Sequence, residues 1–296
     1  MSNILEINNL SKRYGKIQAV NNLSLTVEPG NIYGILGPNG SGKTTTLGII
    51  LGVIRANSGN FKWFGENPRP QSRKRIGAIL ETPNFYTYLS AYKNLKIVAD
   101  IKEIGYDRIE PVLKLVNLYE RRNDPMSNYS LGMKQRLALA SSLVADPEVL
   151  VLDEPTNGLD PQGIADVREV IQKTAKEGKT IIIASHILDE IEKICTHVAV
   201  IKKGNLLASG NIHDVLSKDD KIEVAADDLN MLENILKDFK GVKNIVRAGK
   251  KVVLSVDSSV EPTELNQFLF ENKIILSHLS VSRKSLESTF LELTAE

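Results

Sequence analysis

The sequence contains a single cysteine, Cys195, among 296 residues. One cysteine can form neither a disulfide within the chain nor a cysteine-rich metal site, so we expect a reducing, cytosolic environment. Long hydrophobic runs are also missing, since the longest, residues 47–54, is far shorter than the roughly 20 residues of a membrane-spanning helix. The first residues lack a basic segment before an apolar run, which argues against a secretory signal. We therefore expect a soluble chain that reaches a membrane only by docking to another protein.

Net charge is nearly absent as well, because Lys plus Arg number 37 and Asp plus Glu number 36. This balance gives no support to a nucleic-acid-binding protein held by bulk charge. Hydrophobic residues make up 42% of the chain and charged residues 25%, which is typical of folded domains and excludes a mainly disordered chain. At about 150 residues per domain, the length predicts roughly two domains.

Strand-like and helix-like segments alternate up to about residue 215. The apolar runs at 32–36 and 149–152 are unbroken, which is typical of parallel strands covered on both faces. Residues 89–144 instead carry apolar side chains at helical spacing. We expect an α/β fold built on a mostly parallel sheet. Further strands are expected at 4–8, 19–27, 76–80, 180–184 and 197–201, and helices at 44–51, after residue 160, and at 188–194.

The character of the sequence changes near residue 217, where residues 217–221 read as a charged linker. Beyond it the pattern predicts βαββαβ, the ferredoxin-like order of a small α+β domain. We therefore expect a large domain at 1–216 and an accessory domain at 222–296. The accessory elements are expected at 221–225, 229–239, 242–247, 251–256, 262–272 and 274–281, with a final helix at 286–293. The acids Asp227 and Asp228 and the histidine His278 lack partners at metal-binding spacing, so a regulatory or dimer-stabilising role is expected.

Residues 37–44, Gly-Pro-Asn-Gly-Ser-Gly-Lys-Thr, match the pattern G-x-x-x-x-G-K-[ST] between a buried strand and a helix. The glycines let backbone N–H groups turn toward phosphate oxygens, and the helix start adds its positive dipole end. Lys43 can contact the β- and γ-phosphates of a nucleotide, and the Thr44 hydroxyl can bind Mg²⁺. A chance glycine-rich turn is the alternative, but the flanking strand and helix disfavour it.

Two acids, Asp153 and Glu154, follow the apolar strand at 149–152. In a phosphate-binding loop protein, an acid on a neighbouring strand holds the metal shell, which predicts that Asp153 binds Mg²⁺ through water. Glu154 stands one residue further and could polarise the attacking water as a general base. Two solvated acids at a strand end are the alternative interpretation.

With these motifs the chain resembles the nucleotide-binding subunit of an ABC transporter over about residues 3–215. The resemblance implies a P-loop NTPase fold of ABC type, with a parallel core sheet, an antiparallel β-subdomain and a helical subdomain at about 89–144. It also implies that the chain binds ATP and Mg²⁺ and is an ATPase coupled to transport. By resemblance, Glu154 is the catalytic glutamate, His186 contacts the γ-phosphate, Asp160 lies in the D-loop and Tyr14 stacks on adenine. The remaining nucleotide-binding residues would be Gly37, Pro38, Asn39, Gly40, Ser41, Gly42, Lys43, Thr44 and Thr45.

Two segments depart from the family pattern. The LSGGQ signature is replaced around Ser130, with Leu131 for a glycine and Met133 for the glutamine, while Ser130 and Gly132 match. Glu81 stands where the family carries a glutamine that reaches Mg²⁺; as a carboxylate it would still bind the metal. The alternatives are an ordinary helix cap by Ser130 and a solvated loop acid at 81. Both departures resemble the branch that protects against bacitracin and lantibiotics.

The resemblance also implies partners. Two such subunits sandwich ATP, each nucleotide lying between one chain's phosphate loop and the other's Ser130 segment. We therefore expect a homodimer, or pairing with a related subunit, on a separate permease at the inner face of the membrane, as part of an exporter. The permease would meet the helical region and the aromatic segment 83–89, which could equally be a local core.

Two other functions stay open at this point. One is a soluble ABC-type ATPase that acts on the ribosome or DNA, although such proteins usually carry two cassettes or a coiled-coil insertion. The other is a nucleotide sensor without hydrolysis, against which Glu154 and His186 argue.

Overall fold

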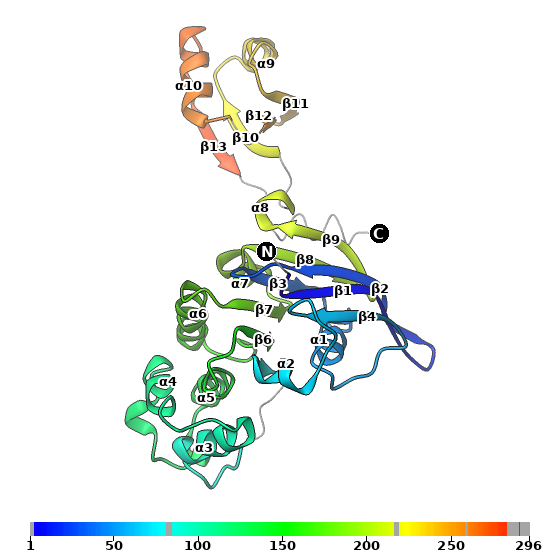
Figure 1. Cartoon of the computed structure of the whole chain (residues 1–296). Coiled ribbons are helices and arrows are strands. Elements are labelled where there is room, and N and C mark those ends of the chain that lie inside the picture. The colour runs from blue at the N-terminus through cyan, green and yellow to red at the C-terminus, as the bar shows by residue number, and fades with distance from the viewer. Residues whose placement is uncertain (1–2, 81–84, 216–218, 258–259, 283–289, 291–296) are drawn as a thin grey trace. The chain divides into compact units, whose positions relative to one another are not determined.

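The computed structural model describes residues 3–80, 85–215, 219–257, 260–282 and 290. The chain forms two compact units, Met1–Asn211 and Ile212–Glu296 (Figure 1). The first unit contains the phosphate loop and both acids of the expected site. It ends five residues before the domain boundary predicted at 216, which stays a prediction.

A six-stranded sheet in the order β5-β6-β7-β3-β8-β9 forms the centre of the first unit. All neighbouring pairs are parallel except β8 with β9. Every residue of β3, β6 and β7 is buried, which explains their unbroken apolar runs. These observations confirm the predicted α/β fold. The strands are β3 (Ile32–Leu36), β5 (Ile76–Ile79), β6 (Val149–Asp153), β7 (Thr180–Ser185), β8 (His197–Lys202) and β9 (Asn205–Asn211).

Strand β9 was not expected from the sequence. It pairs antiparallel at the edge of the sheet, next to β8. Its residues, Asn-Leu-Leu-Ala-Ser-Gly-Asn, are all exposed or half-buried, so no apolar run marks the strand.

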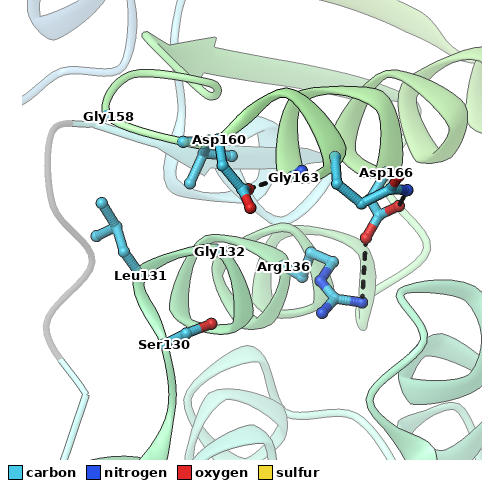
Figure 2. Close-up of a pocket in the computed structure, with 10 residues that line it drawn as sticks. Ser130, Leu131, Gly132, Arg136, Gly158, Asp160, Gly163 and Asp166 are labelled. Atoms are coloured by element: carbon cyan, nitrogen blue, oxygen red, sulfur yellow. Dashed lines mark hydrogen bonds and ion pairs between the residues drawn. The ribbon is translucent and has the colours of Figure 1, made fainter.

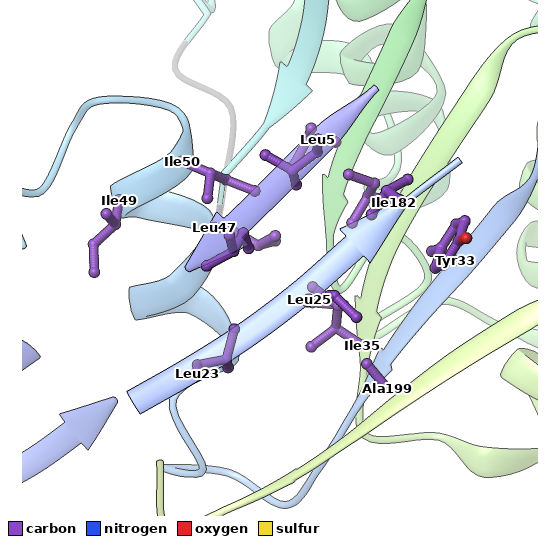
Figure 3. Packing of buried hydrophobic residues seen from close by; sticks show 14 of the residues in the cluster. Leu5, Leu23, Leu25, Tyr33, Ile35, Leu47, Ile49, Ile50, Ile182 and Ala199 are labelled. Carbon is purple, nitrogen blue, oxygen red and sulfur yellow. The ribbon is translucent and has the colours of Figure 1, made fainter. Parts of the chain in front are cut away.

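A three-stranded antiparallel sheet covers one face of this unit, in the order β2-β1-β4. Its apolar side chains, with those of α1 and of the six-stranded sheet, form a single core; Figure 3 shows Leu25, Leu47 and Ile182 within it. The buried Trp63 indole donates to the Ile50 carbonyl at 2.7 Å, which ties the end of the small sheet to the end of α1. The helix that follows the phosphate loop is therefore fixed by packing. The elements are β1 (Leu5–Tyr14), β2 (Ile17–Val27), β4 (Ser58–Trp63) and α1 (Lys43–Ile50).

The region at 89–144 is helical, as predicted. It contains α3, α4 and α5 with two short 3₁₀ turns, and α5 packs against β5. Ser90 caps α3, Ser130 caps α5 and Asp160 caps α6 through side-chain oxygens that accept a backbone N–H. The helices are α2 (Pro70–Lys74), α3 (Ala91–Lys102), α4 (Ile109–Leu115), α5 (Leu131–Leu143), α6 (Pro161–Lys176) and α7 (Leu188–Ile194), and the turns are Tyr119–Arg121 and Met126–Asn128.

The second unit has the predicted βαββαβ order, with an antiparallel sheet arranged β11-β12-β10-β13. Alternate residues of β10 and β12 pack with α9 and α10 in a separate core. The elements are α8 (Ile212–Val215), β10 (Asp219–Ala225), α9 (Leu229–Leu236), β11 (Val242–Ala248), β12 (Lys251–Asp257), α10 (Pro262–Glu271) and β13 (His278–Ser282).

Two predicted boundaries in this unit are wrong. Residues 219–221, predicted as linker, belong to β10, because their backbone pairs with β12 beyond the apolar part of the strand. The last strand begins at His278 rather than at 274. The predicted helix at 286–293 lies outside the described residues, apart from Phe290.

Over the part of the chain that the structure describes, no helix has the length and apolar character needed to cross a membrane.

Candidate functional site

A glycine-rich loop joins the buried strand β3 to helix α1. Gly42 has a φ of 109°, and a Cβ at this position would lie 2.2 Å from the Ala19 backbone oxygen. Gly37 is crowded too, because a Cβ there would lie 2.3 Å from the Ile201 backbone oxygen. Only glycine fits these two positions, so the sequence fixes the path by which the loop enters α1. A helix that starts in this way favours an anion such as phosphate at its N-terminus.

Lys43 is the first residue of α1 and is only 5% exposed. Its ammonium donates to the carbonyl oxygens of Gly37 at 2.8 Å and Pro38 at 3.4 Å. The Oε1 atom of Glu154 lies 3.3 Å from the same nitrogen. The ammonium is therefore turned back onto the loop, where a phosphate oxygen would compete for it with these three acceptors.

Glu154 follows the end of β6 and has a φ of 48°, a left-handed conformation for a residue other than glycine. Its backbone N–H donates to the Ala184 carbonyl at 2.9 Å. Its carboxylate lies between two basic groups, with Oε1 near Lys43 and Oε2 2.9 Å from His186 Nδ1. A carboxylate only accepts hydrogen bonds, so His186 Nδ1 carries the proton in this contact. The structure thus brings together three predicted residues from α1, the end of β6 and the segment after β7.

The predicted metal ligands supply oxygen atoms. Asp153 is buried at the end of β6, and Thr44 lies in the first turn of α1. Carboxylate and hydroxyl oxygens suit Mg²⁺, which proteins usually bind through one or two carboxylates together with water and phosphate oxygens. The described residues contain no group of three His, Cys, Asp or Glu that could hold a metal. Glu81 lies outside the described residues.

A cavity of about 320 Å³ opens beside the loop, lined by Tyr14, Ile17, Ala19, residues 39–45 and Glu154. Tyr14 and Ile17 face each other across the turn between β1 and β2, and the Ile17 side chain is 70% exposed. Together they give one rim of the cavity an apolar surface that suits a planar base. The sequence pointed to Tyr14 but missed Ile17. The two-residue turn Gly-Lys between them was the signal that could have paired them.

The Ser130 segment lines a different cavity of about 350 Å³, at the start of helices α5 and α6 (Figure 2). Ser130 Oγ accepts the Met133 N–H at 3.3 Å, and Asp160 Oδ1 accepts the Gly163 N–H at 3.0 Å. The helix-cap interpretation of Ser130 is therefore correct, and a cap leaves the hydroxyl proton free to be donated. Among the residues that the structure describes, none lines both this cavity and the one at the phosphate loop.

Leu131 also lines this cavity. Its Cδ2 atom lies 3.2 Å from where a Cβ on Gly158 would be, so the side chain is directed at the turn before α6. Figure 2 shows the same direction, with Leu131 turned away from Ser130 and toward Gly158.

Arg136 lines the cavity as well, and no pattern in the sequence indicates its role. Its Nη1 atom lies 3.6 Å from Asp166 on α6 and donates to the carbonyl oxygens of Val116 and Asn117 at 3.3 and 3.4 Å. One guanidinium therefore links α5 to α6 and to the chain just after α4. No spacing rule could have identified these partners, because they come from two segments distant from Arg136 in the sequence.

Known proteins resemble this chain along its whole length. Residues 20–157 match the family described as ABC transporter. The bacitracin transport ATP-binding protein BcrA of Bacillus licheniformis is 38% identical, with 99% of this chain and 98% of BcrA covered. The lantibiotic transport ATP-binding protein SrtF of Streptococcus pyogenes is 41% identical, with 69% of this chain and 89% of SrtF covered.

Solved structures that resemble this chain are also described as parts of ABC transporters. The structure of cbiO1 from Clostridium perfringens, described as part of the ABC transporter complex cbiONQ, has a TM-score of 0.67 and 30% identity. It covers 74% of this chain, and the match includes 92% of cbiO1. This chain therefore belongs to the ABC transporter ATP-binding proteins and is an ATPase subunit of that class.

Proposed function

We propose that this chain is one half of a dimeric ATP-driven motor that powers export through a separate membrane permease. The separation of the two cavities carries the proposal. Phosphoryl transfer needs electrostatic stabilisation around the γ-phosphate, and the phosphate-loop cavity of one chain contains neither Ser130 nor Gly132. A second copy can supply that segment, so that two nucleotides are enclosed between two chains.

Three side chains perform the chemistry in this proposal. Lys43 exchanges its contacts with the loop carbonyls for phosphate oxygens. Glu154 accepts a proton from the attacking water, a role that contributes about 10²- to 10⁴-fold in rate. His186 holds Glu154 through Nδ1, so its Nε2 can donate to a γ-phosphate only when the ring is charged.

Thr44 and Asp153 are the residues that would hold Mg²⁺, which neutralises negative charge on the phosphates when bound. Glu81 is proposed as a further ligand from its position in the sequence alone.

The dimer can be tested by sedimentation velocity of Glu154→Gln with Mg²⁺ and ATP. Gln keeps the shape of the side chain but cannot act as the base, so ATP should stay intact and hold two chains together. Lys43→Ala should stay monomeric because it loses its phosphate contact. Glu169→Gln is a matched control, because it removes a half-exposed carboxylate on α6 that pairs only with Lys173 in the described structure.

Two outcomes would contradict the proposal. A Glu154→Gln variant that binds one ATP per chain yet sediments as a monomer would exclude the dimer. Turnover at the wild-type rate in the same variant would show that Glu154 is not the base.

A surface on the helical region is proposed as the permease contact. A cavity of about 440 Å³ is lined mainly by Phe85, Tyr86, Ile97, Val98 and Ile101. The Asn94 amide accepts the Tyr86 N–H at 2.9 Å and donates to the carbonyl oxygens of Tyr86 and Ser90 at 3.1 and 3.0 Å. The segment is thus held in place before any partner binds.

Exposure argues against the local-core interpretation of this segment. The neighbouring Tyr88 is 73% exposed and Ile101 is 72% exposed. A permease segment that covers these side chains would bind mainly through apolar contacts. Ile101→Glu should abolish recovery of the chain with membranes from its own cells and leave ATP binding unchanged. Full recovery of this variant would exclude this surface.

The relatives suggest the kind of cargo and the location. BcrA and SrtF are described as transport proteins for bacitracin and for a lantibiotic, which supports an antibiotic peptide as the exported molecule. The chain would then lie at the inner face of the membrane, bound to its permease. No observation favours a ribosome or DNA as the partner.

A further inference from the structure

A buried hydroxyl–carboxylate pair lies next to the catalytic segment. The Thr156 hydroxyl donates to Glu190 Oε2, and the two residues are 2% and 5% exposed. They stand 34 positions apart in the sequence. A carboxylate is rarely buried unless hydrogen bonds compensate for lost water, so this contact requires both residues in their observed places.

Thr156 lies in the turn that follows Glu154. The Asn157 N–H donates to the Glu154 carbonyl at 3.2 Å, and the Leu159 N–H donates to the Thr156 carbonyl at 3.2 Å. Glu154 itself is left-handed, a conformation that costs about 1–2 kcal/mol for a residue with a Cβ. Contacts on both sides of Glu154 must therefore hold this conformation. One is the bond from the Glu154 N–H to the Ala184 carbonyl, and the other is made by the side chain of Thr156, two residues later.

Glu190 provides a fixed point for that turn. It lies on α7, four residues after His186. Helix α7 packs closely on β3, because a Cβ on Gly34 would lie 2.6 Å from the Ile191 side chain. Strand β3 leads directly into the phosphate loop, so Glu190 has a set position relative to both His186 and the loop.

We propose that Glu190 and Thr156 are positioning residues, which hold the turn after Glu154 so that its carboxylate stays between Lys43 and His186. The inference rests on the proposed function, since it takes Glu154 as the base. Neither residue lines the phosphate-loop cavity. Loss of their hydrogen bond should therefore misplace the base without weakening nucleotide binding.

Thr156→Val tests the bond, because it removes the hydroxyl at nearly constant volume. We expect kcat to fall about 10- to 100-fold, since small displacements of a catalytic group can cost about 10²-fold. The KM for ATP should change less than about twofold, because Lys43 and the loop keep their contacts. Thr156→Ser restores the hydroxyl and should recover most of the rate.

Thr174→Val is the matched control for lost stability. Thr174 is also a fully buried threonine, but its hydroxyl donates to the Val170 carbonyl within α6, at 2.8 Å. This variant should lower the melting temperature and leave kcat unchanged. If kcat falls equally in Thr156→Val and Thr174→Val, the Thr156 hydrogen bond only stabilises the fold, and the proposal is wrong.

Substitutions of Glu190, which accepts the Thr156 hydrogen bond, provide a second, independent measurement. Glu190→Met removes the acceptor and should lower kcat as Thr156→Val does, whereas Glu190→Gln keeps an oxygen and should lower it less. The double variant Thr156→Val/Glu190→Met should be no slower than the slower single one, because both changes remove the same bond. Additive losses in the double variant would contradict the proposal.

Failure of this inference can be told from failure of the proposed function. If Glu154→Gln is inactive and Thr156→Val turns over at the wild-type rate, the base assignment stands and the positioning role is wrong. If Glu154→Gln keeps its turnover, both are wrong.

Discussion

Gly40 and Gly42 belong to the same loop but differ in the space around them, which predicts unequal responses to alanine. Both have positive φ angles, 77° and 109°. A Cβ on Gly40 would meet nothing within 4 Å, whereas a Cβ on Gly42 would lie 2.2 Å from the Ala19 backbone oxygen. That oxygen belongs to strand β2 and cannot rotate away as a side chain could.

The expected magnitudes follow from these two environments. A left-handed conformation costs an alanine about 1–2 kcal/mol, and both variants incur this cost. Gly42→Ala must also relieve an overlap with fixed backbone, and such overpacking typically costs about 1–3 kcal/mol more. In a unit of this size, 1 kcal/mol corresponds to about 2–4 °C in melting temperature. We expect Gly42→Ala to melt several degrees below Gly40→Ala, roughly 2–12 °C.

The assay is thermal unfolding of the two variants without nucleotide, because Gly40 also lines the cavity and its substitution affects ATP directly. Circular dichroism at several scan rates would separate equilibrium effects from irreversible loss. If both variants melt within 1 °C of each other, the contact between Gly42 and Ala19 does not constrain the loop. The two glycines would then not be what sets the path of the loop.

Other predictions rest on single groups. Burial raises the pKa of the Cys195 thiol, so native protein should resist a thiol reagent at pH 8 and react fully once unfolded. The hydrogen bond from Lys179 lowers the pKa of Asp146, so the stability gained is present above the carboxyl's ordinary pKa of 3.8 and is lost as the pH falls below it. Lys179→Met should therefore lower the melting temperature at pH 7, and this difference should shrink toward pH 3; a constant difference would contradict the reasoning. Glu81→Gln should leave ATP binding intact and shift the Mg²⁺ concentration for half-maximal activity, and an unchanged Mg²⁺ titration would show that Glu81 is a solvated loop acid.

The sequence predicts which candidate site residues lie together where each stands in, or directly after, a recognisable local pattern. The glycines and Lys43 are contiguous, and Glu154 and His186 each follow a buried apolar run. Parallel strands place their carboxyl ends at one edge of the sheet, so residues after β3, β6 and β7 meet there. That rule accounts for the observed contacts of Glu154 with Lys43 and His186.

The sequence does not predict a contact whose partner comes from a distant segment without a pattern of its own. Nothing local marks Glu190 as the acceptor for Thr156, or Asp166 as the partner of Arg136. The edge strand β9 was missed for a related reason, because its pairing with β8 does not depend on an apolar run. Such pairings follow from how whole elements pack, which no local sequence pattern shows.

Leu131, at a position where the family pattern has a glycine, lies beside the groups of the Ser130 segment that we propose to contact phosphate. Ser130 Oγ accepts the Met133 N–H when it caps the helix, so its own hydroxyl proton remains available to donate to a phosphate. The first backbone N–H groups of α5, including that of Gly132, have no carbonyl within the helix to bond. The Leu131 side chain is turned to Gly158. Since the anion-binding atoms are a hydroxyl and backbone amides, a leucine that leaves this face open is compatible with phosphate binding by the segment.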